Sequence, residues 1–147
     1  MPSPFSKRSH SASLHSAQLG EKLTAMNDVE LLRDFALSLP ETAEETPFGP
    51  EVAVYKVAGK MFVTLWPDDV PIPMNLKCDP DRAIELRDQH EAVRPGYHMN
   101  KKHWNTIELD GSLSDDFLRE LIRHSYDLVI SGHKREVKER LLKALES

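Results

Sequence analysis

The chain has 147 residues, which suits a single domain large enough to bury a core without disulfides or metal ions. Apolar residues make up 39% and charged residues 29%, an ordinary balance for a soluble protein, and no run approaches the ~18 apolar residues of a membrane span. The only cysteine, Cys78, excludes a disulfide framework and a multi-thiolate metal site, and it fits a reducing, cytoplasmic compartment. The net charge of −5 argues against general binding of polyanions.

The first 25 residues differ in composition from the rest. They hold seven serines and threonines, three basic residues and a single acid, Glu21. Such a segment buries too little apolar area to fold, so we expect residues 1–25 to form a disordered Ser-rich extension. A basic, acid-poor head also resembles an organellar transit peptide, which stays open as the alternative. We therefore expect the domain to span 26–132, followed by a basic amphipathic helix over 133–147.

The first part of the domain is predicted to be a helix followed by strands. Leucine, alanine and phenylalanine recur at helical spacing over 28–39, where Asn27 is a suitable N-cap and Pro40 stops the helix. The acidic stretch over 41–45 is expected to be a solvated connector. Strands are then predicted from β-branched, aromatic and alternating residues over 52–57, 61–66 and 72–77.

The second part is predicted to place a strand between helices. Asp79 is a good N-cap and Pro80 at the first helical position costs no hydrogen bond, so we expect a helix that ends near His90. The stretch over 93–96 is expected to break regular structure. Ser114 is the expected cap of a long helix. The remaining elements are a strand over 103–109 and helices over 115–131 and 133–147.

Short turns between consecutive strands favour antiparallel pairing, and the amphipathic helices need a sheet face to cover. The fold class is therefore predicted to be α+β, an antiparallel sheet meander packed against helices in two layers. On the last helix, Glu136 stands four residues before Arg140 and Glu139 four before Lys143. We expect these pairs to lie on a solvated face, so that this helix serves for docking and not as a primary site.

The motifs of common catalytic and nucleotide sites are missing from the sequence. There is no Gly-x-Gly-x-x-Gly, no phosphate-binding Gly-Lys-Ser/Thr loop, no Gly-x-Ser-x-Gly and no His-Glu-x-x-His. Cys78 is expected to be a small buried side chain, and the Asp68-Asp69 pair to be solvated. The sequence therefore predicts no catalytic residues, no metal and no cofactor.

The unusual segment is 94–106, which we call the basic aromatic segment; no acid occurs between Glu91 and Glu108. Cations neutralise phosphates, aromatic rings stack on bases, and asparagine pairs with base edges, so the segment predicts contact with DNA. The alternative is a pocket for a small anionic ligand or a protein partner, lined by its histidines, asparagine and tryptophan. The candidate site residues are Arg94, Tyr97, His98, Asn100, Lys101, Lys102, His103 and Trp104.

A structural interpretation of the same residues also stays open. Trp104 can be an ordinary core residue, and Tyr97 can cover a helix end. The two histidines can serve as hydrogen-bonding scaffolds, while Lys101 and Lys102 can protect a strand edge from pairing with another chain.

The runs Val93-Arg94-Pro95, His98 to Thr106 and Leu109 to Leu113 resemble the MmcQ/YjbR family of small bacterial proteins. The resemblance covers about residues 27 to 132. We expect a non-enzymatic, cytoplasmic protein, and an enzyme that uses His98 and His103 as acid and base stays open as a third alternative. The resemblance implies an α+β fold with an antiparallel sheet, a winged arrangement of strands and a DNA-binding role. That role would fall on six positions of this chain, Arg94, His98, Asn100, Lys101, His103 and Trp104.

Overall fold

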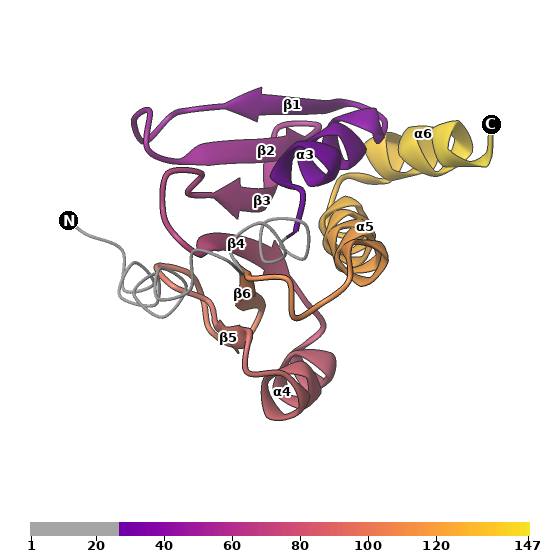
Figure 1. Cartoon of the computed structure of the whole chain (residues 1–147). Helices are drawn as coiled ribbons and strands as arrows, with labels where there is room; N and C mark the ends of the chain where they lie inside the picture. Colours follow the sequence, from indigo (N-terminus) through magenta and orange to yellow (C-terminus); the bar gives the residue numbers. More distant parts are fainter. Residues whose placement is uncertain (1–26) are drawn as a thin grey trace, which may run out of the picture.

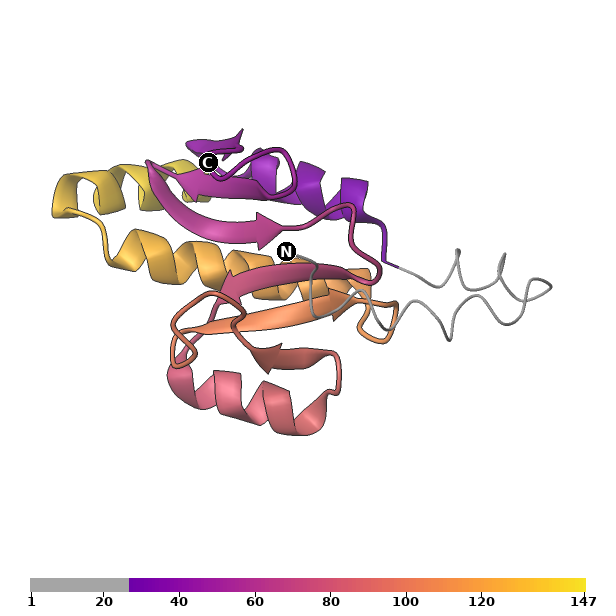
Figure 2. The same ribbon diagram turned by 90° about the vertical axis from the view of Figure 1, so that its left-hand side faces the viewer.

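The computed structural model describes residues 27–147, so the predicted extension over 1–25 lies outside the described residues. A six-stranded antiparallel sheet forms one layer, and helices α3, α5 and α6 form the other (Figure 1). In the turned view the sheet lies toward the viewer with these helices behind it (Figure 2). The α+β class and the two-layer arrangement are therefore confirmed. None of the described helices is both long and apolar enough to cross a bilayer.

Polar side chains cap three of the four helices that lie within residues 27–147. In α3 (Val29–Ser38) the Asp28 side chain accepts from the Leu31 N–H, whereas Asn27, the predicted cap, donates to the Leu113 carbonyl at 2.8 Å. Asn27 therefore ties the start of the domain to the loop before α5 (Asp115–Ser131). The other caps are as predicted, Asp79 for α4 (Pro80–Gln89) and Ser114 for α5.

The last helix, α6 (Arg135–Glu146), begins without a side-chain cap. Its ion pairs differ from the predicted ones. Arg135 pairs with Glu139 at 3.0 Å, and Arg140 reaches Glu41, before the first strand, at 2.6 Å. Arg140 therefore pairs with Glu41, which is distant in the chain but close in the fold, and not with Glu136 four residues before it.

The sheet has the order β1-β2-β3-β4-β6-β5, and two of its strands were not expected. The acidic stretch over 41–45 forms an exposed edge strand, and the stretch over 93–96, expected to break regular structure, forms a three-residue edge strand. Both predictions were wrong because edge strands need no buried face and so show no hydrophobic pattern. The strands are β1 (Thr42–Glu45), β2 (Ala53–Val57), β3 (Lys60–Leu65), β4 (Ile72–Lys77), β5 (Val93–Pro95) and β6 (Trp104–Leu109).

The core lies between one face of the sheet and α3 and α5. Phe62 of β3 packs edge-on against Tyr126 of α5 with ring centroids 5.5 Å apart, and both are fully buried. Ser125 donates to the Phe62 carbonyl at 2.6 Å and so fastens the middle of α5 to the sheet. Because side chains alternate between the faces of a strand, half of the strand residues point to the opposite face, on which no described helix lies (Figure 2).

Candidate binding site on the uncovered sheet face

A row of polar residues crosses the uncovered face. Register places Thr64 of β3 opposite Asn75 of β4, Asn75 opposite Thr106 of β6, and Thr106 opposite Arg94 of β5. Residues paired in this way lie on the same face of a sheet. Thr64, Asn75 and Thr106 are all buried, although no described helix covers this face.

The chain that follows β5 covers part of this row. Asn75 donates through Nδ2 to the Tyr97 carbonyl at 3.0 Å, and the Tyr97 N–H donates to Thr106 Oγ1 at 2.8 Å. The Thr106 hydroxyl in turn donates to Asn75 Oδ1. Two buried side chains therefore satisfy both backbone groups of Tyr97, and this fixes where the basic aromatic segment lies on the sheet.

The base of the segment is held from two sides. The Gly96 N–H donates to the Trp104 carbonyl at 2.9 Å, and a Cβ on Gly96 would lie 2.8 Å from both Cβ and the carbonyl oxygen of Trp104. Arg87 of α4 donates to Asn105 Oδ1 at 2.7 Å and to the Lys101 carbonyl. Sequence reasoning did not single out Arg87, although helix spacing offered one signal, since it follows the buried Ala83 by four residues.

Two of the three Lys and Arg side chains of the basic aromatic segment are bonded within the fold. Arg94 Nε lies 2.6 Å from Glu108 Oε1, and the Glu108 side chain is 0% exposed. Burial raises the pKa of Glu108 above its ordinary value, and the Arg94 guanidinium opposes that rise. Lys101 Nζ donates to the Gly96 carbonyl at 3.0 Å. Lys102 is exposed and forms no ion pair with a described residue.

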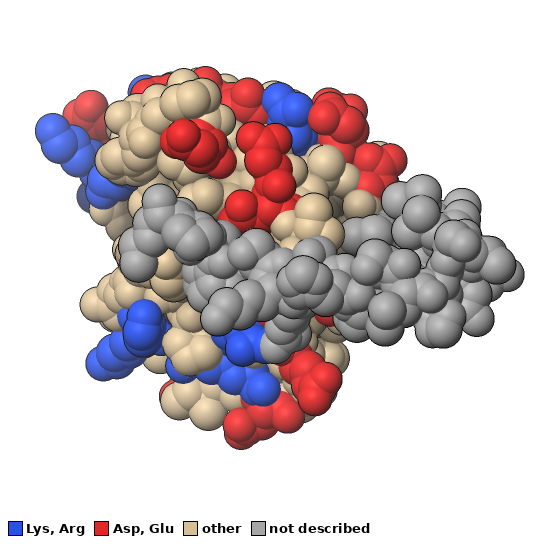
Figure 3. Space-filling view, turned by 60° about the vertical axis from the view of Figure 1, so that its left-hand side comes forward, with Lys and Arg blue, Asp and Glu red and all other residues tan. Residues whose placement is uncertain are grey.

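Charge is unevenly distributed over this face. In Figure 3 a group of Lys and Arg side chains lies on its lower half, where Figure 1 places β5 and α4. Acidic side chains predominate on the upper half and also lie beside the basic group at the bottom. The basic group is therefore local and bordered by acids.

Among the remaining candidate residues, Asn100 stabilises a turn and His98 packs against Tyr97. Asn100 Oδ1 accepts from the Lys102 N–H at 2.9 Å, and the Asn100 carbonyl accepts from the His103 and Trp104 N–H groups. These contacts build the tight turn that leads into β6. His98 has a positive φ of 60°, and its ring centroid lies 3.9 Å from that of Tyr97. Of the eight candidate residues, His98 alone lines the pocket on this face.

That pocket lies next to the polar row and has a volume of about 490 Å³. Thr64 lines it and is only 4% exposed, and its Oγ1 has no hydrogen-bond partner among the described residues. Tyr97 stands between Trp66 and His98, with its ring centroid 6.4 Å from that of Trp66. Sequence reasoning missed most of this lining because the residues come from separate strands and loops. The described lining residues are Phe48, Val52, Met61, Thr64, Trp66, His98 and Met99.

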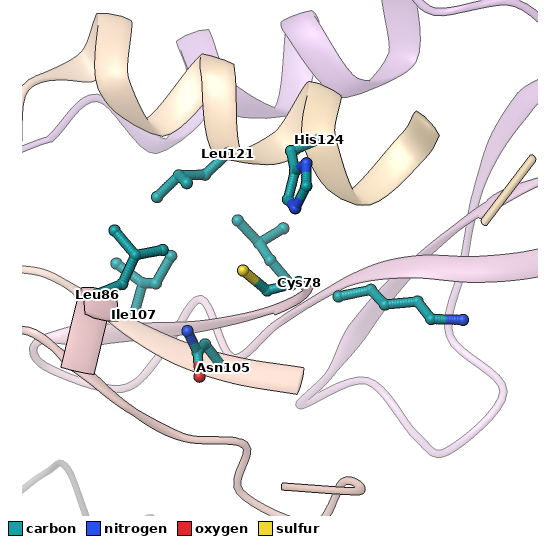
Figure 4. A pocket seen from close by; sticks show the side chains of 8 residues that line it. Cys78, Leu86, Asn105, Ile107, Leu121 and His124 are labelled. Carbon is teal, nitrogen blue, oxygen red and sulfur yellow. The ribbon is translucent and has the colours of Figure 1, made fainter. Parts of the chain in front are cut away.

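A second cavity, lined in part by Cys78, Asn105 and His124 (Figure 4), is too small for a ligand. Its volume is about 10 Å³, close to the minimum for one water molecule. Burial raises the pKa of the Cys78 thiol, and the nearby His124 accepts the Asp79 N–H at 3.2 Å. A thiol with a raised pKa beside a histidine that is already bonded is not an activated nucleophile. Within 27–147, no three His, Cys, Asp or Glu side chains are grouped to hold a metal ion.

Comparison with known proteins adds relatives of similar sequence and fold. A model of the YjbR family matches residues 37–128. The uncharacterised protein YbdF of Escherichia coli O157:H7 is 37% identical over 113 residues, which are 76% of this chain and 92% of that protein. The uncharacterised protein YjbR of Escherichia coli K12 is 41% identical over 69 residues, 47% of this chain and 58% of the relative.

Two solved structures share the fold. The Deinococcus radiodurans protein DR2400, with a DUF419 domain, has a TM-score of 0.74 and 38% identity, and the match covers 80% of this chain and 89% of that one. A Pseudomonas syringae protein has a TM-score of 0.60 and 28% identity over 70% of this chain and 98% of its own.

Proposed function

The chain belongs to the YjbR family, and from the pocket on its uncovered sheet face we propose that it is a non-enzymatic protein that binds a small organic molecule. The observation that carries this proposal is a pocket of about 490 Å³ with a buried hydroxyl, that of Thr64, without a partner among the described residues. Pockets for small molecules commonly measure about 300–1,000 Å³ and combine apolar walls with a few polar groups. The pocket has this composition.

The residues around the pocket favour binding over catalysis. General acid–base chemistry needs a titratable group near the reacting atoms, usually oriented by a second one. Among the described lining residues only His98 is titratable, and no described carboxylate lines the pocket to orient it. The buried thiol of Cys78 lies in the separate cavity described above.

DNA binding through the basic aromatic segment is the second candidate. The local group of Lys and Arg in Figure 3 favours it, as does the exposure of Lys102. The ion pair of Arg94 with Glu108 speaks against it, because the carboxylate already balances the Arg94 charge, and Lys101 uses one of its three N–H groups on the Gly96 carbonyl. We therefore rank DNA binding below the binding of a small molecule.

A ligand screen tests the first candidate. The full-length protein is titrated with a library of small molecules while the amide and indole N–H signals are followed by NMR. Met61→Trp is the control, because a larger side chain on the pocket wall fills the space. We expect ligands that shift signals of the pocket residues in the wild type and not in Met61→Trp. Ligands that bind both proteins equally, or no ligand at all, would reject the proposal.

Fluorescence anisotropy with a labelled DNA duplex at low salt tests the second candidate. If DNA is bound through this segment, Lys102→Ala weakens binding. It also reduces the slope of the logarithm of the binding constant against the logarithm of the salt concentration by about one, which corresponds to one lost phosphate contact. Lys143→Ala on α6 is a matched control that removes the same charge elsewhere. Equal affinities and salt slopes for the two variants would remove the segment from consideration as a DNA site.

A further inference from the structure

We infer that the pocket selects a flat, uncharged aromatic compound that carries one hydrogen-bonding group. This inference rests on the small-molecule function proposed above and names the class of ligand. It departs from the anionic ligand expected from the sequence. Three features of the pocket carry it: the rings and thioethers of its walls, the absence of lysine, arginine, aspartate and glutamate from its described lining, and the hydroxyl of Thr64.

The walls suit a flat ring. Trp66 and Phe48 contribute aromatic rings, and Met61 and Met99 contribute thioethers, which make favourable contacts with aromatic edges and adapt to irregular shapes. Phe48 is 71% exposed, so a ligand that covers its ring removes apolar surface from water. Burial of that surface favours an apolar, largely aromatic ligand.

The electrostatics of the pocket favour an uncharged ligand. None of the described lining residues is a lysine, arginine, aspartate or glutamate. The cations Arg94, Lys101 and Lys102 of the neighbouring segment are not among the described lining residues, and the buried Glu108 already balances the charge of Arg94. A carboxylate or phosphate in this pocket would lose water and find no permanent positive charge among the described lining residues, which is unfavourable.

The Thr64 hydroxyl needs a hydrogen-bond partner, which one polar group on the ligand can supply. Its cross-strand neighbour Asn75 does not serve it: the Asn75 amide donates to the Tyr97 carbonyl and accepts from the Thr106 hydroxyl. A buried hydroxyl without a partner is costly, and a ligand that bonds to it removes that cost. Since a hydroxyl both donates and accepts, a phenol, an amide or a ring N–H on the ligand can satisfy it.

Three matched probes test the inference on the full chain: 2-naphthol, naphthalene and 2-naphthoate. They share the same ring system and differ in carrying a hydroxyl, nothing or a negative charge. The chain has two tryptophans, of which Trp66 lines the pocket and Trp104 does not, so their indole N–H signals report binding at the pocket and away from it. We expect 2-naphthol to shift the Trp66 signal and to bind about tenfold tighter than naphthalene, and 2-naphthoate to bind most weakly.

Thr64→Val keeps the shape of the side chain and removes its hydroxyl. We expect this variant to bind 2-naphthol no better than naphthalene while its affinity for naphthalene is unchanged. Thr42→Val is the matched control, because Thr42 lies on β1, outside the lining, and donates to the Leu39 carbonyl. It should keep the full tenfold preference.

The outcomes separate this inference from the proposed function. Tighter binding of 2-naphthoate than of 2-naphthol would overturn the uncharged class and leave a small-molecule site in place. A preference for 2-naphthol that survives Thr64→Val would overturn the role of the hydroxyl. If none of the three probes shifts Trp66, the aromatic class is wrong, and the library screen with Met61→Trp decides separately whether the pocket binds any small molecule.

Discussion

Replacing Arg94 by methionine tests whether this arginine serves the fold or a ligand. The substitution keeps an unbranched apolar side chain and removes the positive charge 2.6 Å from the Glu108 carboxylate. The Glu108 side chain is 0% exposed, so its ionised form depends on that charge. An arginine kept for phosphate contact would be replaceable with little effect on stability.

The expected loss follows from the burial of the two partners. Removing one partner of a fully buried ion pair costs about 3–5 kcal/mol. The Arg94 side chain is 39% exposed, so water screens part of the interaction and we expect about 2 kcal/mol at pH 7. For a domain of this size that loss lowers Tm by roughly 8 °C. Urea unfolding followed by circular dichroism measures it.

The loss depends on pH in a defined direction. The pKa of Glu108 is raised in the folded chain, so the folded state holds this proton more tightly than the unfolded state. Its contribution to stability is therefore greatest below the ordinary value of 4.5 and falls as pH rises through the folded pKa. Without Arg94 that pKa rises further, so the deficit of Arg94→Met should be large at pH 7 and shrink toward pH 4.

A double variant completes the test. Glu108→Gln removes the charge that Arg94 balances, so Arg94→Met combined with Glu108→Gln should recover most of the stability lost by Arg94→Met alone. A deficit that is the same at pH 7 and pH 4, or a double variant no more stable than Arg94→Met, would refute the argument that the guanidinium stabilises a buried carboxylate.

Three further predictions concern the fold around the site. Gly96→Ala places a Cβ 2.8 Å from the Trp104 carbonyl oxygen, so thermal unfolding should show a loss of about 2 kcal/mol. Ser114→Ala removes the acceptor of the Phe117 N–H at the start of α5 and should cost about 1 kcal/mol in urea unfolding, with an unchanged m-value. Because Cys78 is buried and its pKa is raised, a thiol reagent at pH 7 should label it only as fast as the protein unfolds, and fast labelling of the native protein would contradict its placement.

The predicted elements show where local sequence is informative. Strong apolar periodicity located α5 within a residue, and the caps Asp79 and Ser114 were recognised from residue type and position. Asn27 and Asp28 are both good caps, and which one serves depends on the loop before α5, where Asn27 is bonded. The two edge strands escaped prediction because exposed, short strands carry no pattern of alternating burial.

The candidate site, like the fold, was predicted only in part from the sequence. Composition drew attention to the basic aromatic segment, and that segment does lie on the uncovered face, with His98 in the pocket. Composition could not reveal that Arg94 would meet the buried Glu108, since the two are brought together by the pairing of β5 with β6. Nor could it reveal the pocket, whose walls come from β3 and from loops that are distant in the chain.

Sequence alone thus determined the fold class, the helices and the family resemblance, because these depend on periodicity, caps and a contiguous run of residues. Tertiary structure alone decided which cations are bonded within the fold and which side chains line a cavity. The physical reason is that burial and partnership depend on strand register and on loop placement. Thr64 is an example: its hydroxyl is buried without a partner among the described residues because of neighbours that are far from it in the chain.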